Sequence, residues 1–269
     1  MNAQAKFAPD PADGKLTICT SRGIEWTHIF GIGTGYTANP VRGCTHGCQW
    51  RMPDGKIVSC YAETFADRLG GKGAFKNLTF HPDVLSKIFR HKEPARIFID
   101  SMSDLCGEGV DKEWIGAVIG FMQNCPQHIF FTLTKNPRRL TEFVWPDNAM
   151  VGISAPPTFM YGKELSFGQQ QAWFTKGMAW LAAAKAKRKW VSLEPLSTGA
   201  ILEALALNSG TLDWAVIGAG SDGRKTFQPE EYLLEATLRC LTCSVFFKGN
   251  LDRALAQRHG GWREEFPKL

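Results

Sequence analysis

The sequence contains no stretch of about 18 consecutive apolar residues, which is the length that a membrane-spanning helix requires. Its opening segment, MNAQAKFAPDPADGK, lacks the apolar core of a signal peptide. No internal repeat, low-complexity tract or linker divides the chain. Hydrophobic residues make up 44% and charged residues 21% of the 269 residues, a composition that excludes a mostly disordered chain. We therefore expect a cytoplasmic protein that folds as a single domain over residues 1–269.

A disulfide framework is not expected either, because a chain of this length without a signal peptide folds in a reducing compartment. The segment NPVRGCTHGCQWRMPDGKIVSCYAE (39–63) nevertheless brings three thiols close together in the sequence. Three thiols cannot all pair with one another, so the segment indicates a metal centre, a nucleophile or accidental crowding. The eight cysteines of the chain are Cys19, Cys44, Cys48, Cys60, Cys106, Cys125, Cys240 and Cys243.

The charge balance is mildly basic. The formal net charge is +5 and the sequence pI is about 8.8, which is compatible with an anionic partner such as nucleic acid. The clearest basic run, KAKRK (185–189), is expected to end a helix, where cations suit the helix dipole.

Short β-rich runs alternate with helical patterns along the chain. Strands are expected at 95–100, 128–134, 149–154, 189–196, 213–220 and 244–250, with a further extended segment at 35–41. Helices are expected at 61–69, 112–123, 137–144, 167–187, 200–207 and 229–241. The strands are nearly continuous apolar runs, which is typical of strands covered on both faces. The pattern predicts a parallel α/β fold with about seven strands, a partial or complete (β/α) barrel.

Polar residues and glycines follow the apolar part of each predicted strand. In a parallel fold these carboxyl ends meet at one face, which is where binding sites form. Taken singly, Ser103 and Asp104 are also good helix N-cap residues, and the glycines of GAGSDG can mark only a tight turn. Glu194 is the strongest candidate, since a carboxylate at a buried strand end needs a partner. The candidate ligand-contacting residues are Ser101, Ser103, Asp104, Lys135, Ser154, Glu194, Gly218 and Gly220; no catalytic residue can be assigned.

The three clustered cysteines allow several interpretations. Free cysteine packs well in a core, but the neighbouring Gly43, Thr45, His46 and Gly47 indicate a loop. A structural zinc site wants four ligands, and His46 is the only further candidate nearby. Cys240 and Cys243 could supply a pair, but they fall on a helical pattern next to a strand, where burial is expected.

An iron–sulfur cluster explains the count of three. Thiolates are the usual ligands of such clusters, and three of them around four irons leave one iron without a protein ligand. If S-adenosylmethionine chelates that iron, electron transfer cleaves its sulfonium to a 5′-deoxyadenosyl radical. The polar strand ends would then line the S-adenosylmethionine site.

The pattern NPVRGC-THGC-CYAE resembles the cluster motif of radical S-adenosylmethionine (radical SAM) enzymes. A phage-associated branch of that superfamily shares further stretches in the same order: IEWT (24–27), SMSDL (101–105), LTKNP (133–137), VGIS (151–154), SLEPL (192–196), then VIGAG and FFK. The resemblance implies a TIM-barrel-like fold, a 4Fe–4S cluster on Cys44, Cys48 and Cys60, and S-adenosylmethionine as cofactor. It also implies an electron donor as partner, and the host cytoplasm as location if a phage encodes the chain.

The chain departs from the usual Cys-x3-Cys-x2-Cys spacing in its second gap, which has eleven residues. The inserted piece QWRMPDGKIVS (49–59) contains the turn signal PDG, so we expect a β-hairpin that returns Cys60 to the cluster. Residues 1–23 are expected to form an N-terminal extension. The turn GAGSD also lacks the acidic residue that relatives place directly after two glycines, so Asp222 is not assigned that residue's task.

The resemblance and the basic charge together imply a nucleic-acid substrate. The favoured reaction is the isomerisation of a glycinyl–thymine adduct during thymidine hypermodification of phage DNA, with DNA as a partner. If duplex DNA is the substrate, its base must be extruded, and Trp50, Arg51 and Lys56 on the insertion are candidate contacts. The alternative for the insertion is a surface hairpin with no partner. The alternatives are radical modification of RNA or of a free nucleotide, and a non-enzymatic, zinc-stabilised module that binds nucleic acid.

Overall fold

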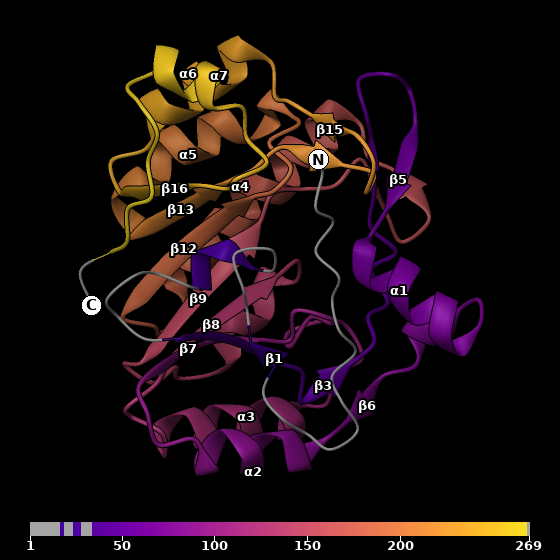
Figure 1. Ribbon diagram of the computed structural model, residues 1–269, viewed down its shortest axis with the longest axis vertical. Helices are drawn as coiled ribbons and strands as arrows, with labels where there is room; N and C mark the ends of the chain where they lie inside the picture. The colour runs from indigo at the N-terminus through magenta and orange to yellow at the C-terminus, as the bar shows by residue number, and fades with distance from the viewer. Residues whose placement is uncertain (1–16, 19–23, 28–33, 268–269) are drawn as a thin grey trace.

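The computed structural model describes residues 17–18, 24–27 and 34–267. Its main element is an eight-stranded sheet in which every neighbouring pair is parallel except the first (Figure 1). The predicted N-terminal extension lies outside the described residues except for Thr17–Ile18. The strands in spatial order are β1 (Thr17–Ile18), β2 (Thr34–Ala38), β7 (Ala95–Ile99), β8 (Ile129–Thr134), β9 (Ala149–Ser154), β12 (Arg188–Leu193), β13 (Trp214–Ile217) and β16 (Ser244–Phe247).

The order of the strands in space follows their order in the chain, as in a barrel built from successive β–α units. Within the described ranges no pairing joins β16 to β1 or β2, so the barrel is partial. The predicted parallel α/β fold is therefore confirmed in its partial form. That the whole chain is a single domain stays a prediction. No helix among the described residues is long and apolar enough to span a membrane.

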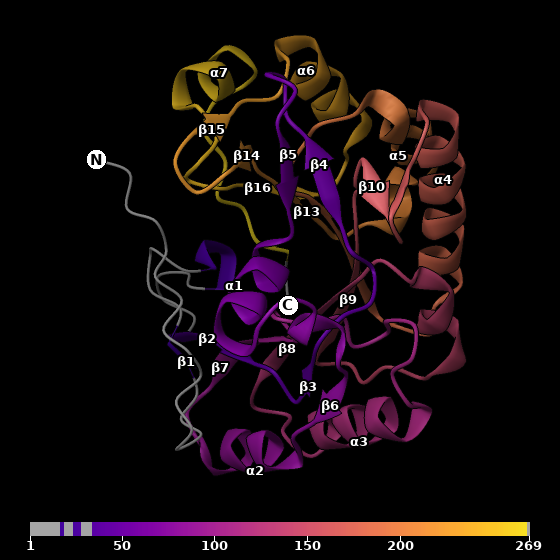
Figure 2. The same ribbon diagram turned by 90° about the vertical axis from the view of Figure 1, so that its right-hand side faces the viewer.

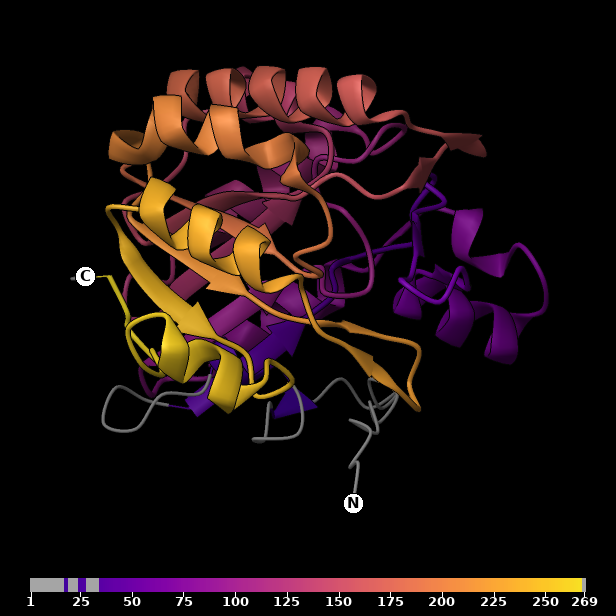
Figure 3. The ribbon, with the colours of Figure 1, turned by 90° about the horizontal axis from the view of Figure 1, so that it is seen from above.

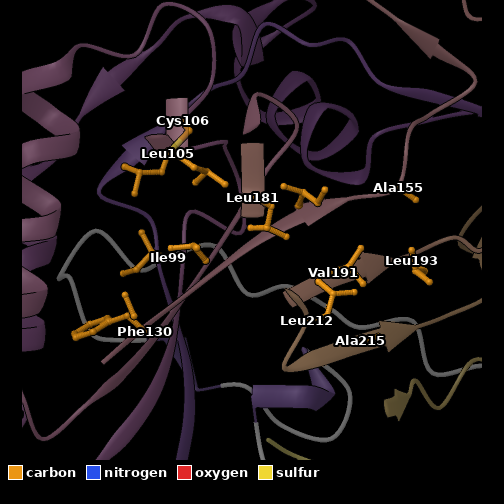
Figure 4. Close-up of a cluster of buried hydrophobic side chains, with 14 of the residues drawn as sticks. Ile99, Leu105, Cys106, Phe130, Ala155, Leu181, Val191, Leu193, Leu212 and Ala215 are labelled. Atoms are coloured by element: carbon orange, nitrogen blue, oxygen red, sulfur yellow. The ribbon is translucent and has the colours of Figure 1, made fainter. Parts of the chain in front are cut away.

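Helices cover the outer face of the sheet (Figures 1 and 3). On β7, Ile97 and Ile99 point to this face and Phe98 to the inner one, as the two-residue period of a strand requires. Figure 4 shows part of the outer core, including Leu181 and Val191. The helices are α1 (Tyr61–Gly70), α2 (Pro82–Arg90), α3 (Lys112–Gln123), α4 (Phe167–Ala183), α5 (Leu202–Asn208), α6 (Glu231–Cys240) and α7 (Arg253–Arg258).

Aromatic side chains fill the inner face of the partial barrel. Trp26, from the 3-10 turn Glu25–Thr27, lies 4.9 Å from Phe98, 5.0 Å from Trp190 and 5.7 Å from Trp214 between ring centroids. All four rings are buried, and offset or edge-on packing of this kind adds to their apolar burial. This aromatic cluster forms a floor beneath the carboxyl ends of the strands.

Two details of the interior depend on particular residues. Gly152 on β9 leaves room for the Trp190 indole, which a side chain at that position would strike. Near the amino-terminal end of β7, Arg96 is fully buried with its guanidinium 4.2 Å from the centre of the Phe266 ring. Burial lowers the pKa of Arg96 to about 10.

Several predicted elements need correction. The predicted helix at 137–144 is a 3-10 helix over Pro137–Glu142, and the long helix ends at Ala183 instead of residue 187. The basic run therefore enters strand β12, although the Lys189 ammonium still donates to the Ala182 carbonyl of the helix end at 2.6 Å. Helices α2 and α7 were not predicted, and neither were the two-residue strands outside the main sheet.

Removing the centre of the aromatic floor should destabilise the fold. We expect Trp26→Ala to lower the free energy of unfolding by about 3–5 kcal/mol, because it leaves a large cavity among rings that cannot collapse. Urea unfolding followed by far-ultraviolet circular dichroism measures this change. As a control, Tyr232→Ala removes a ring that is 65% exposed and should stay within about 0.5 kcal/mol of the native protein. A loss below about 1 kcal/mol for Trp26→Ala would contradict the assigned role.

Candidate metal centre and its surroundings

The loop that carries the first two cysteines follows strand β2 and the short strand β3 (Val41–Arg42). Gly43 opens the loop with φ 91°, and a side chain there would strike the Asn77 carbonyl. The Cys44 N–H then donates to the Phe75 carbonyl at 2.7 Å. Glycine is thus required where the chain turns into the cysteine loop.

The inserted residues form a hairpin, as their turn signal predicts. Strands β4 (Gln49–Arg51) and β5 (Ile57–Ser59) pair antiparallel, with Gln49 opposite Ser59 (Figure 2). The next pair along the ladder brings the Cys60 N–H to the Cys48 carbonyl at 2.9 Å. The eleven inserted residues therefore leave and return at the same place, and α1 begins directly after Cys60.

The three cysteines share one environment. Burial raises the pKa of the Cys44 thiol, and the negative charges of Asp104, Cys48 and Cys60 raise it further. Burial likewise raises the pKa of Cys48 to about 12, with Cys60 again adding to the rise. The charges of Cys48 and Cys60 both act on Cys44, so the three sulfurs lie within electrostatic range of one another.

Asp104 organises the polar side of the cysteine loop. Its carboxylate accepts the backbone N–H of Cys106 at 3.0 Å and that of Lys135 at 2.8 Å. It also lies 3.5 Å from Nδ1 of His46, and that nitrogen is 3.0 Å from the Cys44 sulfur. Burial lowers the pKa of His46, an effect that Asp104 partly offsets. Asp104 therefore ties the end of β8 to the loop that carries Cys44.

Lys135 supplies a cation to this environment. Burial lowers its pKa, but Cys48, Cys60, Asp104 and Cys44 together outweigh burial and leave the pKa raised. Its ammonium also lies 5.7 Å from the centre of the Trp50 ring, within the range of a cation–π contact. Lys135 thus stays protonated beside the cysteines.

A second polar group lies at the ends of β12, β13 and β16. The Lys248 ammonium is 2.7 Å from Oε2 of Glu194, whose other carboxylate oxygen accepts from the Ser192 hydroxyl at 3.3 Å. Burial lowers the pKa of Lys248, but Glu194 more than compensates and the net pKa is raised. A side chain at Gly218 would meet both Lys248 and Glu194 within 3.3 Å. The partner expected for the Glu194 carboxylate at a buried strand end is therefore Lys248.

Glu25 completes this second group and was not found from the sequence. Its carboxylate accepts the Gly249 N–H at 2.5 Å and adds to the raised pKa of Lys248. The residue precedes Trp26, so packing of that ring into the aromatic floor fixes the carboxylate at the strand ends. The sequence signal for Glu25 was its place in the IEWT stretch. Its contact with Gly249 could not be predicted, because that contact forms only in the folded barrel.

The remaining candidates have different surroundings. The Ser101 hydroxyl donates to the Asn39 side chain at 3.2 Å and the Ser103 hydroxyl to the Val41 carbonyl at 2.9 Å, so both support the loop after β2. Ser154 is buried at the end of β9, in register with Ser192. Gly220 lies farther out, against the thioether of Met52. Asp104 and Lys135 adjoin the cysteines, whereas Glu194 and Gly218 belong to the second polar group.

The candidate nucleic-acid contacts on the insertion stay a prediction, but the structure gives them partners within the chain. The Arg51 guanidinium is 2.8 Å from Glu164, and the Lys56 ammonium is 2.6 Å from Asp222. Trp50 faces Lys135. The two cations are therefore already paired within the chain.

The spacing of the cysteines bears on which metal they could hold. Among the described residues, no three His, Cys, Asp or Glu side chains are arranged to bind a single metal ion. A mononuclear zinc site needs all its sulfur and nitrogen ligands within about 2.0–2.3 Å of one ion. In a 4Fe–4S cluster each thiolate binds a different iron. The donor set of Cys44, Cys48 and Cys60, with a protonated Lys135 beside it, is chemically suited to an iron–sulfur cluster.

A family model described as "Protein of unknown function (DUF5131)" matches residues 21–249. The chain belongs to this family. No curated protein matches the sequence.

Among solved structures, the chain is similar to a variant of spore photoproduct lyase, with a TM-score of 0.46 and 14% identity over 78% of this chain and 62% of the other. A second variant, with bound AdoMet and dinucleoside spore photoproduct, gives a TM-score of 0.45 and 14% identity over 76% and 60%. Spore photoproduct lyase complexed with dinucleoside spore photoproduct gives 0.43 and 16% over 68% and 55%. This DUF5131 protein thus spans less than two thirds of the length of these structures.

A buried carboxyl beside the cysteine loop should make stability depend on pH. Burial raises the pKa of Asp100 well above the ordinary carboxyl value, although hydrogen bonds from Val41 and Ser103 lower it. The folded protein then keeps a proton that the unfolded chain releases above about pH 4, so stability falls as pH rises toward the folded-state pKa. Asp100→Asn should remove this fall and stabilise the protein at pH 8 by on the order of 1 kcal/mol.

Urea unfolding at several pH values between 4 and 8, roughly the range of the carboxyl titration, measures the effect. Asp147→Asn is the matched control, because that side chain is 82% exposed. An Asp100→Asn variant whose stability falls with pH as steeply as that of the native protein would refute the assignment.

Proposed function

We propose that the chain is a radical SAM enzyme in which Cys44, Cys48 and Cys60 bind a 4Fe–4S cluster. The observation that carries this proposal is the hairpin, which returns Cys60 to Cys48 despite the eleven-residue gap. When bound, the cluster and S-adenosylmethionine supply a 5′-deoxyadenosyl radical that abstracts hydrogen from a substrate carbon. The open iron of a three-cysteine cluster is the position for S-adenosylmethionine.

The chain's own residues have separate tasks in this proposal. Lys135 offsets the negative charge of the thiolates, and Asp104 orients the cysteine loop through His46. The pair of Glu194 and Lys248 offers one acceptor and one donor to the polar groups of S-adenosylmethionine or substrate. Ser101, Ser103, Ser154, Gly218 and Gly220 complete the walls of the proposed site. The aromatic floor keeps water from the inner end of the barrel.

We assign the substrate to nucleic acid, and the chain to the phage-associated branch whose motifs it shares. The favoured reaction is the isomerisation of a glycinyl–thymine adduct in DNA, with an external electron donor. Radical modification of RNA or of a free nucleotide is the second enzymatic candidate, supported by the closed surroundings of the site described below. A non-enzymatic, zinc-stabilised module that binds nucleic acid is the third candidate, and the metal content of the purified protein distinguishes it from the other two.

Replacing the proposed ligands should remove the cluster. After anaerobic reconstitution with iron and sulfide, the native protein should be brown with broad absorption near about 400 nm, as is usual for thiolate-bound iron–sulfur centres. Cys44→Ala, Cys48→Ala and Cys60→Ala should each lose most of this absorption and the cleavage of S-adenosylmethionine. The control Cys240→Ala, at the end of α6, should retain both. Full cluster content and cleavage in Cys60→Ala would disprove the ligand assignment.

The substrate proposal predicts a specific product. DNA carrying the glycinyl–thymine adduct, incubated with the enzyme, S-adenosylmethionine and a reductant, should yield a nucleoside of unchanged mass and shifted retention time. Liquid chromatography with mass spectrometry detects this pair of properties. A changed nucleoside mass would indicate another radical modification, and activity only on RNA or free nucleotides would favour the second candidate.

A further inference from the structure

One side of the inserted hairpin is joined to the hairpin that follows strand β9. Strand β10 (Phe159–Met160) pairs with β4 through Phe159 and Gln49, which makes one four-stranded sheet of β11 (Lys163–Glu164), β10, β4 and β5. The Arg51 N–H donates to the Thr158 hydroxyl at 3.0 Å. The Arg51 guanidinium pairs with Glu164, as described above.

The other side contacts the hairpin that follows strand β13, formed by β14 (Gly220–Ser221) and β15 (Thr226–Phe227). Two oppositely oriented ion pairs join them: Lys56 to Asp222 at 2.6 Å, and Lys225 to Asp54 at 3.4 Å. Because each hairpin supplies one cation and one anion, the two tips are complementary in charge.

Asp222 is the best-fixed member of these contacts. Its carboxylate accepts the backbone N–H groups of Arg224 at 2.8 Å and Lys225 at 2.6 Å, and its side chain is only 9% exposed. The hydrogen bond from Lys56 is the main cause of its lowered pKa. Asp222 is therefore a preformed anchor for the inserted hairpin.

These contacts place the hairpin over the mouth of the partial barrel. In the sheet, β12 lies between β9 and β13. A hairpin attached to the segments after β9 and β13 passes above the carboxyl end of β12, which is followed by Glu194. Figure 2 shows β4 and β5 between β10 and the β14–β15 hairpin.

The two faces of the hairpin differ in character. Trp50 and Arg51 on β4, and Met52 directly after it, alternate between the two faces, as the two-residue period of a strand requires. Trp50 faces Lys135, and Met52 is buried against Gly220. Arg51 and its partner Glu164 are about half exposed. The face toward the site is thus aromatic and apolar, and the charged face points outward.

We infer that the hairpin Gln49–Ser59 covers the mouth of the partial barrel and restricts the substrate to one unpaired nucleotide. We call this hairpin the roof, and its contacts with the two neighbouring hairpins the clasp. This inference rests on the proposed nucleic-acid function. The partly buried Trp50 ring on the inner face of the hairpin suits stacking with a planar base, and the polar strand ends suit the hydrogen-bonding edge of that base. A base in a duplex must first leave its stack, and the clasped roof blocks the approach of the paired strands. Free nucleotides and single strands both present an unpaired base of this kind.

Binding measurements with charge-reversed variants test the roof. The probes are fluorescein-labelled oligothymidylate, the same strand annealed to its complement, and thymidine monophosphate as competitor, all with reconstituted enzyme and S-adenosylmethionine at fixed salt. The native protein should bind the single strand at least about tenfold more tightly than the duplex. If thymidine monophosphate competes at a similar concentration, the free nucleotide is the form that the site binds. If thymidine monophosphate does not compete, the single strand is that form.

Asp222→Lys places two cations opposite each other and should open the clasp, so the tenfold preference should fall toward equality. Adding Lys56→Asp restores an ion pair of reversed polarity and should restore the preference. Lys187→Asp is the matched control: it disrupts an exposed ion pair with Asp147 at the opposite end of the strands and should leave the preference unchanged.

Hydrogen exchange of the hairpin amides in the cluster-free protein provides a second measure. Exchange should be faster in Asp222→Lys and return to the native rate in the double variant. Unchanged exchange in the single variant, or equal binding of duplex and single strand by the native protein, would overturn the roof but leave the cluster assay unaffected. Failure of all three probes to bind would overturn both the roof and the nucleic-acid function.

Discussion

The antiparallel pairing of Gln49 with Ser59 is the contact on which the candidate site depends. It converts an eleven-residue separation in sequence into a single backbone hydrogen bond between Cys60 and Cys48. The cost of closing a loop grows only with the logarithm of its length, so an insertion that forms its own ladder is tolerated at little expense in stability. The same ladder places Trp50 and Met52 over the strand ends. One local pairing thus positions both a proposed metal ligand and the ceiling of the site.

Charge is distributed around the site in two partly buried groups. One contains the cysteines, Asp104 and Lys135, and the other contains Glu25, Glu194 and Lys248. Removing Lys135 or Lys248 would leave carboxylates without a cation in a poorly hydrated environment, which costs more than the pair itself contributes. The groups belong to different strands, so their mutual compensation also holds the open end of the partial barrel in one arrangement.

The sequence was most informative where local pattern and global fold agree. Apolar runs such as 149–154 are strands because both faces are covered, and the PDG turn predicts its hairpin from local chemistry alone. Fewer elements could be predicted where a strand or an ion pair depends on contacts between distant parts of the sequence. The pairing of β10 with β4 joins segments more than a hundred residues apart, so it depends on the folded barrel. The ion pairs of Arg51 with Glu164 and of Lys56 with Asp222 could not be foreseen for the same reason. Helix α2 was missed although Pro82 opens it, because its polar face dominates a short segment.

The aromatic floor has a consequence for how deep a bound molecule can reach. The rings of Trp26, Trp190 and Trp214 are at most 3% exposed and lie against one another inside the partial barrel. A molecule bound at the strand ends can therefore penetrate no deeper than these rings. It would be held by the loops that follow the strands, so substitutions in those loops could alter its binding without disturbing the packing below.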